Sequence, residues 1–193
     1  MVTTSGNTTG SGSFLTDVKT LRQQAREHLR DGPVTDNYQV DKDQTIELLQ
    51  AVLATEIVCV LRYQANSIAA EGINSESVAD EFTEHANDEQ KHVDLVANRI
   101  DQLGGTPDFN PATLTARAAT EYSNGETLID MIKENLVAER IVIEHYRELI
   151  RFFGEKDPTT RIMLEGILSD EEDHASDMHD LLVAHEGRPF LEG

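Results

Sequence analysis

The chain has 193 residues, of which 38% are hydrophobic and 5% aromatic, and its formal net charge is −20. This length can bury a sizeable core in one domain, and so acidic a chain disfavours phosphate contact and attracts cations. The single cysteine, Cys59, excludes an intramolecular disulfide and any multi-cysteine zinc or iron–sulfur site, which agrees with a reducing compartment.

The first forty residues divide into a tail and a helical extension. Residues 1–13 are mostly Gly, Ser and Thr, which predicts a flexible tail and lacks the pattern of a signal peptide. Residues 14–40 contain a short amphipathic pattern from Phe14 to Arg30, closed by D-G-P, and then a linker. Because no apolar run approaches ~18 residues, we expect no membrane span. The single cysteine and the lack of a signal-peptide pattern predict a cytoplasmic location.

Residues 41–185 contain four long helical patterns, and residues 186–193 form a C-terminal tail. The first pattern spans about 41–70, and the second runs from 75 or 77 to 103, before a Gly-Gly pair. The third begins near 123 and ends near 154, and the fourth spans about 158–185. Candidate capping residues are Asp41 with Gln44, Ser123 with Glu126, and Asp157 before Pro158. Matched helices of this length predict a four-helix bundle.

The connections predict the order of the helices. The first and last connections need only about four residues, so each joins an antiparallel pair. The middle connection has about twenty residues, long enough to cross the bundle and give up-down-down-up order. A short helical turn is expected after Pro111.

Each predicted helix has one glutamate near mid-length in its apolar stripe, and two of these precede a histidine by three residues. Several carboxylates in a core would cost many kcal/mol or be forced to protonate unless cations neutralise them. Glutamate oxygen and imidazole nitrogen suit iron or manganese, and carboxylates can bridge two metals. The candidate catalytic and metal-binding residues are Glu56, Glu89, His92, Glu139, Glu171 and His174.

Other polar residues near these stripes have simpler interpretations. Glu172 lies about 100° from Glu171 on a helix, so we expect it to face outward. Tyr63 and Tyr146 are expected to be hydrogen-bonding core residues. The remaining neighbours are expected at the surface or in solvated pairs: Arg62, Arg140, His85, His145 and His179.

At this point the sequence resembles the ferritin-like superfamily, and within it bacterioferritins and Dps-like proteins with a bacterioferritin-type site. The resemblance covers about residues 40–185 and rests on T-E-I-V-C-V-L-R-Y, D-E-Q-K-H-V-D, A-E-R-I-V-I-E-H-Y and D-E-E-D-H. It implies two iron ions per subunit, with manganese as an alternative. Glu89 and Glu171 would bridge the ions; Glu56 and His92 would hold one, and Glu139 and His174 the other.

Two departures from bacterioferritins bear on cofactor and assembly. The position that holds a haem-ligating methionine in that family is Gln90 here, so haem is not expected. The segment after residue 185 is too short for the fifth helix of that family, so a homo-oligomeric cage of 12 subunits is favoured over one of 24. The thiol-linked variants of the group need a cysteine pair, which a single Cys59 cannot supply.

These features predict a ferroxidase that stores or detoxifies iron, with Fe(II) and O2 or H2O2 as substrates. The same ligands would serve a non-storage di-metal enzyme, such as a peroxidase, a manganese catalase or an oxygenase. A Dps-type DNA-protecting protein is a further alternative, disfavoured by the net charge. A metal-free interaction bundle is the last; it predicts that leucine at Glu56 or Glu139 would stabilise the fold.

Overall fold

The computed structural model describes residues 15–70 and 75–186, and the chain divides into two units, Met1–Asp36 and Asn37–Gly193. In the first unit, α1 (Val18–Glu27) is capped by Asp17, whose side chain accepts from the backbone N–H groups of Lys19 and Thr20. The helix is shorter than the pattern at 14–30, and none of its residues is buried. The tail expected at 1–13 lies outside the described residues, and so does the tail expected at 186–193, except for Glu186, which is the last residue of α6. The expected domain limits stay a prediction.

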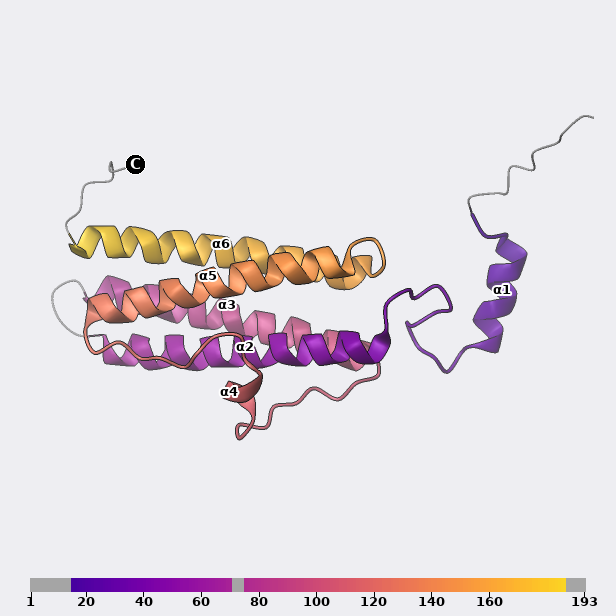
Figure 1. Cartoon of the computed structure of the whole chain (residues 1–193), viewed down its shortest axis with the longest axis horizontal. Coiled ribbons are helices and arrows are strands. Elements are labelled where there is room, and N and C mark those ends of the chain that lie inside the picture. The colour runs from indigo at the N-terminus through magenta and orange to yellow at the C-terminus, as the bar shows by residue number, and fades with distance from the viewer. Residues whose placement is uncertain (1–14, 71–74, 187–193) are drawn as a thin grey trace, which may run out of the picture. The chain divides into compact units, whose positions relative to one another are not determined.

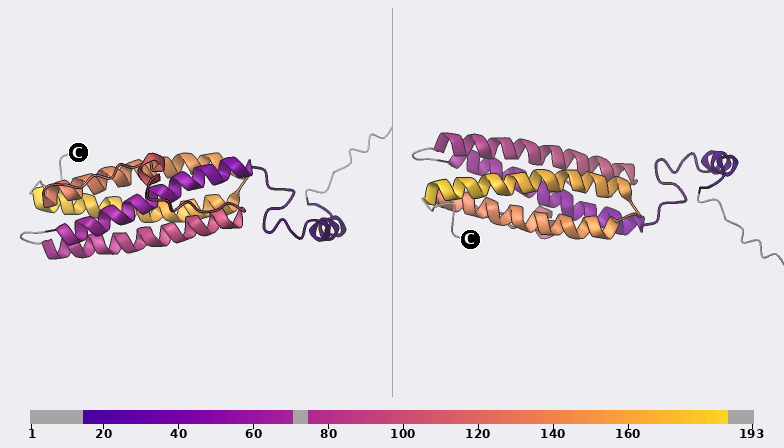
Figure 2. Two further views of the ribbon diagram at one scale, coloured as in Figure 1. Left: turned by 90° about the horizontal axis from the view of Figure 1, so that it is seen from below. Right: turned by 90° about the horizontal axis from the view of Figure 1, so that it is seen from above.

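The second unit is a four-helix bundle built from α2 (Lys42–Ala69), α3 (Ser75–Gln102), α5 (Leu128–Phe153) and α6 (Pro158–Glu186) (Figure 1). Figure 2 shows the same four helices running side by side from two further directions. Helix α2 packs mainly on α3, and α5 on α6. All elements in the described part of the chain are helical, so the predicted all-α four-helix bundle, with its long crossover and an N-terminal helical extension, is confirmed.

The helix ends confirm two of the three expected caps. Asp41 accepts from the backbone N–H of Gln44 at 2.8 Å, and Asp157 accepts from that of Thr160 at 3.0 Å. The box expected at Ser123 and Glu126 was wrong: α5 starts later, with Thr127 as its cap in a box with Asp130. Both segments have the same spacing of residue types, but the first contains Gly125, a poor helix former, and Thr127 is extended.

The long connection between α3 and α5 crosses the bundle against α2, as expected (Figure 1). It contains one short helix, α4 (Leu114–Arg117), whose Leu114 packs on Ala54 and Val58 of α2. Gln50 holds the connection through hydrogen bonds to Thr106 and Asp108, and Arg117 donates to the Gln50 carbonyl. The connection between α3 and α5 therefore covers the side of the core formed by α2.

Helix α2 is the most apolar helix of the bundle. Among the described residues it alone is long and apolar enough to cross a membrane, with a mean hydropathy of 1.5 over its most apolar window. In this structure 56% of that window is buried inside the protein, and buried core helices pass the same test of length and composition. Its buried face includes Glu56 and Arg62, so α2 contributes charged side chains to the core as well as apolar ones.

Candidate metal centre

All six residues predicted as ligands lie in the core at mid-bundle. Helices α2 and α5 each contribute one glutamate, and α3 and α6 each contribute a glutamate and a histidine one turn later. Their exposed fractions run from 0% for the three glutamates of α2, α3 and α5 to 4% for His174. They are Glu56, Glu89, His92, Glu139, Glu171 and His174.

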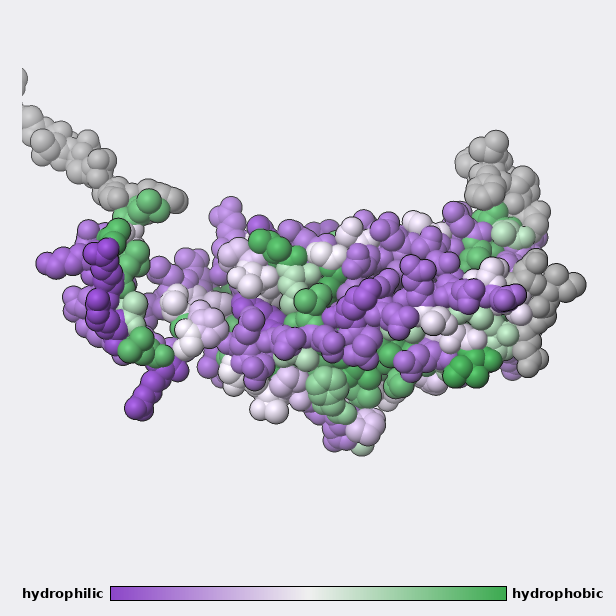
Figure 3. Space-filling view, turned by 180° about the vertical axis from the view of Figure 1, so that it is seen from behind, coloured by the Kyte–Doolittle hydropathy of each residue, from purple (hydrophilic) through white to green (hydrophobic). Residues whose placement is uncertain are grey.

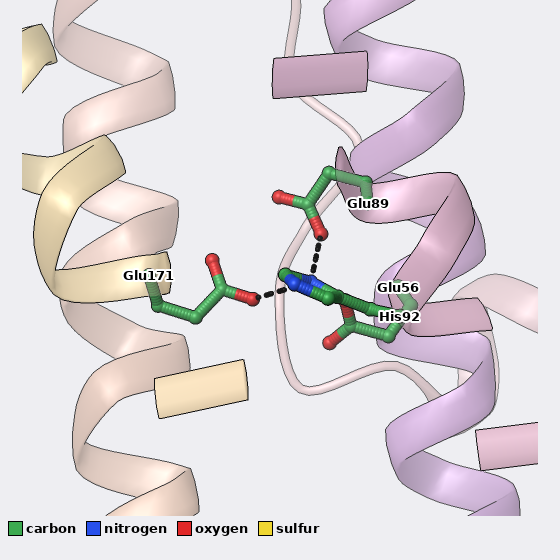
Figure 4. A group of neighbouring side chains, drawn as sticks. All are labelled: Glu56, Glu89, His92 and Glu171. Atoms are coloured by element: carbon green, nitrogen blue, oxygen red, sulfur yellow. Dashed lines mark hydrogen bonds and ion pairs between the residues drawn. The ribbon is translucent and has the colours of Figure 1, made fainter. Parts of the chain in front are cut away.

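The first half of the cluster surrounds the imidazole of His92 (Figure 4). Its Nδ1 atom lies 3.2 Å from Glu56 Oε2, 3.5 Å from Glu89 Oε2 and 3.2 Å from Glu171 Oε1. Figure 4 shows the Glu171 carboxylate reaching this ring from a helix on one side, whereas Glu89 and Glu56 come from the same side as His92. One ligand atom from each of these four residues lies within 4.8 Å of the others, which is close enough for one metal ion.

The second half has the same composition around His174. Its Nδ1 atom lies 3.7 Å from Glu89 Oε1 and 3.4 Å from Glu171 Oε2. Together with Glu139, these residues form a second group of four whose ligand atoms lie within 4.8 Å of one another. Glu89 and Glu171 belong to both groups and offer one oxygen to each side, so the geometry matches two ions bridged by two carboxylates.

The polar atoms of this cluster fit a cation. Both carboxylate oxygens of Glu89 and of Glu171, Oε2 of Glu139 and Nδ1 of His174 are buried and make no hydrogen bond among the described residues, and apart from Oε2 of Glu139 their contacts here are the ion-pair distances given above. Buried polar atoms are normally paired, because leaving one unpaired costs about 1–3 kcal/mol. Six such atoms in one cluster, all of metal-binding types, are the arrangement expected where metal ions complete the coordination.

A ring of hydrogen-bonding residues surrounds the six. Tyr63 on α2 donates to Glu139 Oε1 at 2.5 Å, and Tyr146 on α5 donates to Glu56. Each tyrosine lies seven residues after its own helix's glutamate and contacts the other helix's glutamate. On the outer side, Asp170 Oδ2 lies 3.2 Å from His92 Nε2, and Asp88 Oδ2 lies 3.8 Å from His174 Nε2. Such partners fix ligand orientation.

The ionisation of the cluster reflects burial and crowding. Burial raises the pKa of Glu56 and of Glu139 well above the ordinary range, and the neighbouring carboxylates raise each further. Burial alone would lower the pKa of His174, but its contacts with Glu171 and Glu89 raise it to about 11. Without metal, therefore, protons partly neutralise the buried carboxylates; a bound cation would take over that role.

Two neighbouring residues differ from their expected placement. His85, expected in a solvated pair, is 2% exposed and stacks on His174 with ring centroids 4.0 Å apart. Burial has the largest effect on the pKa of His85, and the charge of the neighbouring His174 acts in the same direction, so that the pKa falls to about 4. Arg62, expected at the rim, is 1% exposed and donates from Nε to Asn135 at 2.8 Å. His85 does follow the apolar period of its helix, and that signal could have identified it.

A third residue, His145, was also expected in a solvated pair, but it is half-buried and its Nε2 atom has no hydrogen-bond partner among the described residues. The other expectations around the site agree with the structure. Tyr63 and Tyr146 are buried and hydrogen-bonded. Glu172 is exposed and pairs with Arg147 at 2.8 Å, so Glu171 is the inward residue of the two. Gln90 is exposed and donates to Asp94 at 3.2 Å.

Comparisons with known proteins agree with this geometry. A family model described as a ferritin-like domain matches residues 46–186. The DNA protection during starvation protein of Pyrococcus furiosus is 26% identical over 157 residues, which cover 80% of this chain and 85% of that protein. The bacterioferritin of Mycobacterium leprae is 27% identical over 130 residues, which cover 67% of this chain and 77% of that one.

A solved structure is similar over a comparable length. It is a bacterioferritin-related protein from Bacteroides fragilis, described as a dodecameric thioferritin. It superimposes with a TM-score of 0.74 and 31% sequence identity, covering 80% of this chain and 94% of that chain. The matched part of the chain therefore includes the bundle that holds the buried cluster.

Proposed function

This chain belongs to the ferritin-like family, and from that premise we propose that it is a ferroxidase that oxidises Fe(II) with O2 or H2O2 and stores or detoxifies the product. The observation that supports this best is the pair of four-residue groups sharing Glu89 and Glu171 in the bundle core. Two Fe(II) ions, as substrate, would give up one electron each. Those electrons and two protons reduce O2 to H2O2, or H2O2 to two molecules of water.

Each residue of the cluster has a role in this proposal. The carboxylates of Glu56, Glu89, Glu139 and Glu171 supply the negative charge that favours Fe(III) over Fe(II). The Nδ1 atoms of His92 and His174 complete the two halves, with Asp170 and Asp88 beside their Nε2 atoms. When His92 carries its proton on Nε2, that N–H donates to Asp170 Oδ2 and leaves the Nδ1 lone pair directed at the ion.

We further propose that the chain forms a dodecameric cage. The Bacteroides fragilis relative, which is 31% identical, is described as dodecameric, and this description supports the proposal. That relative is also described as a thioferritin, whereas the present chain has only one cysteine, buried Cys59. A cysteine pair within one subunit is therefore not part of the proposed chemistry.

The test is to load anaerobic protein with Fe(II), then admit O2 or H2O2 in separate runs while recording oxidation rate, stoichiometry and particle size. We expect a fast phase that saturates at two irons per chain, then slower growth of a ferric core inside a particle of constant protein mass. No saturable phase at two irons would contradict the ferroxidase proposal. Saturation with no further iron uptake would instead indicate the non-storage di-metal enzyme.

A further inference from the structure

A third group of metal-binding side chains lies outside the six-residue centre. Glu81 and His85 are on α3, and Asp177 is on α6. His85 Nε2 lies 3.3 Å from Glu81 Oε1 and 3.5 Å from Asp177 Oδ2, and one ligand atom from each residue lies within 4.8 Å of the others. One imidazole and two carboxylates form a donor set for divalent first-row metals.

This third group lines an acidic pocket of about 200 Å³ between α3 and α6. The pocket is lined by two imidazoles and six carboxylates, and among the described residues that line it none is Lys or Arg. One of the imidazoles is His174, so the pocket reaches the six-residue centre. Walls of one charge raise the local concentration of cations. The carboxylates are those of Glu81, Glu84, Asp88, Asp170, Asp173 and Asp177.

The three side chains of the third group differ in exposure, from half-exposed to buried. The Asp177 side chain is 50% exposed, that of Glu81 is 33% exposed and that of His85 only 3%. The His85 ring stacks on His174 at a centroid distance of 4.0 Å and an interplanar angle of 24°. A cation held by Glu81 and Asp177 would therefore be separated from His174, a proposed ligand of the buried centre, by the stacked His85 ring.

The hydrogen bonding of His85 argues against a purely structural cluster. Its Nδ1 atom is buried without a partner among the described residues, so the protein does not hold the ring by both nitrogens. Its Nε2 atom can donate only one proton, yet two carboxylates lie within 3.5 Å of it. A divalent cation coordinated by Nε2 would satisfy both carboxylates at once.

We propose that Glu81, His85 and Asp177 form a third divalent-cation site, from which Fe(II) passes along the acidic pocket to the six-residue centre. Binding at this site is independent of the reaction at the centre, whereas the delivery role rests on the proposed ferroxidase function. The site would thus bind Fe(II) before the ion reaches the buried ligands.

Binding is tested by equilibrium dialysis of the full chain with Mn(II) as the only metal. With one ion per ligand group, we expect three ions per wild-type chain and two in a Glu81→Gln, Asp177→Asn double variant. Glu89→Gln with Glu171→Gln should retain one ion, at the third site. Asp180→Asn, which removes an exposed charge from α6 outside the pocket, should still bind three. Equal counts in the wild type and in the pocket variant would overturn the third site.

Delivery is tested by the initial rate of Fe(II) oxidation with iron limiting at two per chain. We expect the Glu81→Gln, Asp177→Asn variant to oxidise roughly tenfold more slowly with an unchanged final amplitude, because the cation-focusing charges are lost but the centre is intact. Asp180→Asn should match the wild type. An unchanged rate in the pocket variant would overturn delivery. Three bound Mn(II) ions without saturable iron oxidation would overturn the ferroxidase proposal and leave the third site standing.

Discussion

Two tyrosines connect the halves of the bundle at the residue scale. Tyr63 of α2 donates to Glu139 of α5, and Tyr146 of α5 donates to Glu56 of α2. Each hydrogen bond occupies one oxygen of its glutamate and restricts the orientation of the other. The two hydrogen bonds thus repeat the approximate symmetry of the proposed ligands, so the tyrosines orient two of these glutamates as well as filling the core.

Replacing Tyr146 with Phe should weaken the centre without unfolding the bundle. The ring still fills its place in the core, but Glu56 loses the hydroxyl that orients it. We expect the affinity for Mn(II) to fall by about tenfold or more, as measured by equilibrium dialysis. Tyr122→Phe is the matched control, because Tyr122 is exposed. The Mn(II) affinity of this variant should equal that of the wild type. Equal affinities in both variants would show that the hydroxyl does not position Glu56.

Replacing Glu139 with Gln separates stability from activity. The carboxylate is fully buried beside other carboxylates, so in metal-free protein its removal should stabilise the fold by about 1–3 kcal/mol. The amide oxygen can still accept from Tyr63. In urea unfolding of metal-free protein we expect a higher midpoint, and in the iron assay we expect loss of the fast phase. The exposed Glu144→Gln on the same helix should change neither. Normal oxidation by Glu139→Gln would remove this residue from the ligand set.

Sequence periodicity identified the inward residues of the centre because it reports which face of a helix is apolar. All four stripe glutamates and both histidines are buried where the period placed them. Periodicity could not predict the burial of Arg62, which depends on Asn135 of another helix. It also could not predict the stacking of His85 on His174, which lies on α6. Contacts between helices far apart in sequence leave no local pattern, so the charge of Arg62 suggested a surface position for it. For His85 the apolar period did indicate burial, but its polarity favoured a solvated pair.

At the element scale, helix starts differ in how strongly the structure fixes them. Asp41 caps α2 from an exposed position with one hydrogen bond to backbone. Asp157 caps α6 while buried, receives Arg99 Nη2 at 3.0 Å on both oxygens, and also accepts from Thr160 and Tyr38. The sequence predicted both caps from residue type and spacing, but the partners that distinguish them come from α3 and from the segment before α2.

Asp157→Ala should therefore cost more than Asp41→Ala. We expect about 3 kcal/mol for Asp157, because a buried arginine loses its partner, and about 1 kcal/mol for Asp41, as for an ordinary cap. Both are measured by urea unfolding of metal-free protein at neutral pH. Equal losses would show that the Arg99 pair adds nothing to the cap.

The same pair predicts a pH dependence. Burial would raise the pKa of Asp157, but its hydrogen bonds to Thr160 and Tyr38 and the Arg99 charge hold it below the ordinary value. Because its pKa is lower in the folded than in the unfolded state, the Asp157 carboxylate stabilises the fold at pH values above its unfolded-state pKa of about 3.9. This stabilisation is lost as the pH falls through the folded-state pKa. The difference between wild type and Asp157→Ala should thus be constant near neutral pH and shrink in acid. A difference that grew in acid would contradict this assignment.

At the scale of the whole molecule, charge is the property that most separates this chain from a DNA-binding protein. The net charge is −20, and the face opposite the view of Figure 1 is mostly hydrophilic (Figure 3). The relative from Pyrococcus furiosus is named for DNA protection, so the family relationship alone does not decide the matter. In this chain the basic residues of α1 and its flanks are Lys19, Arg22, Arg26 and Arg30.

We expect the full chain not to retard linear duplex DNA in a gel at about 0.15 M salt, because phosphate contacts need clusters of Lys or Arg and the overall field repels DNA. A variant with all four basic residues of the α1 region changed to Gln should behave identically. A retarded band that weakens as salt rises would contradict the prediction, and its loss in that variant would assign the contact to α1. Without such a band, protection of DNA by this protein would have to act through removal of Fe(II) and peroxide, the substrates of the proposed centre.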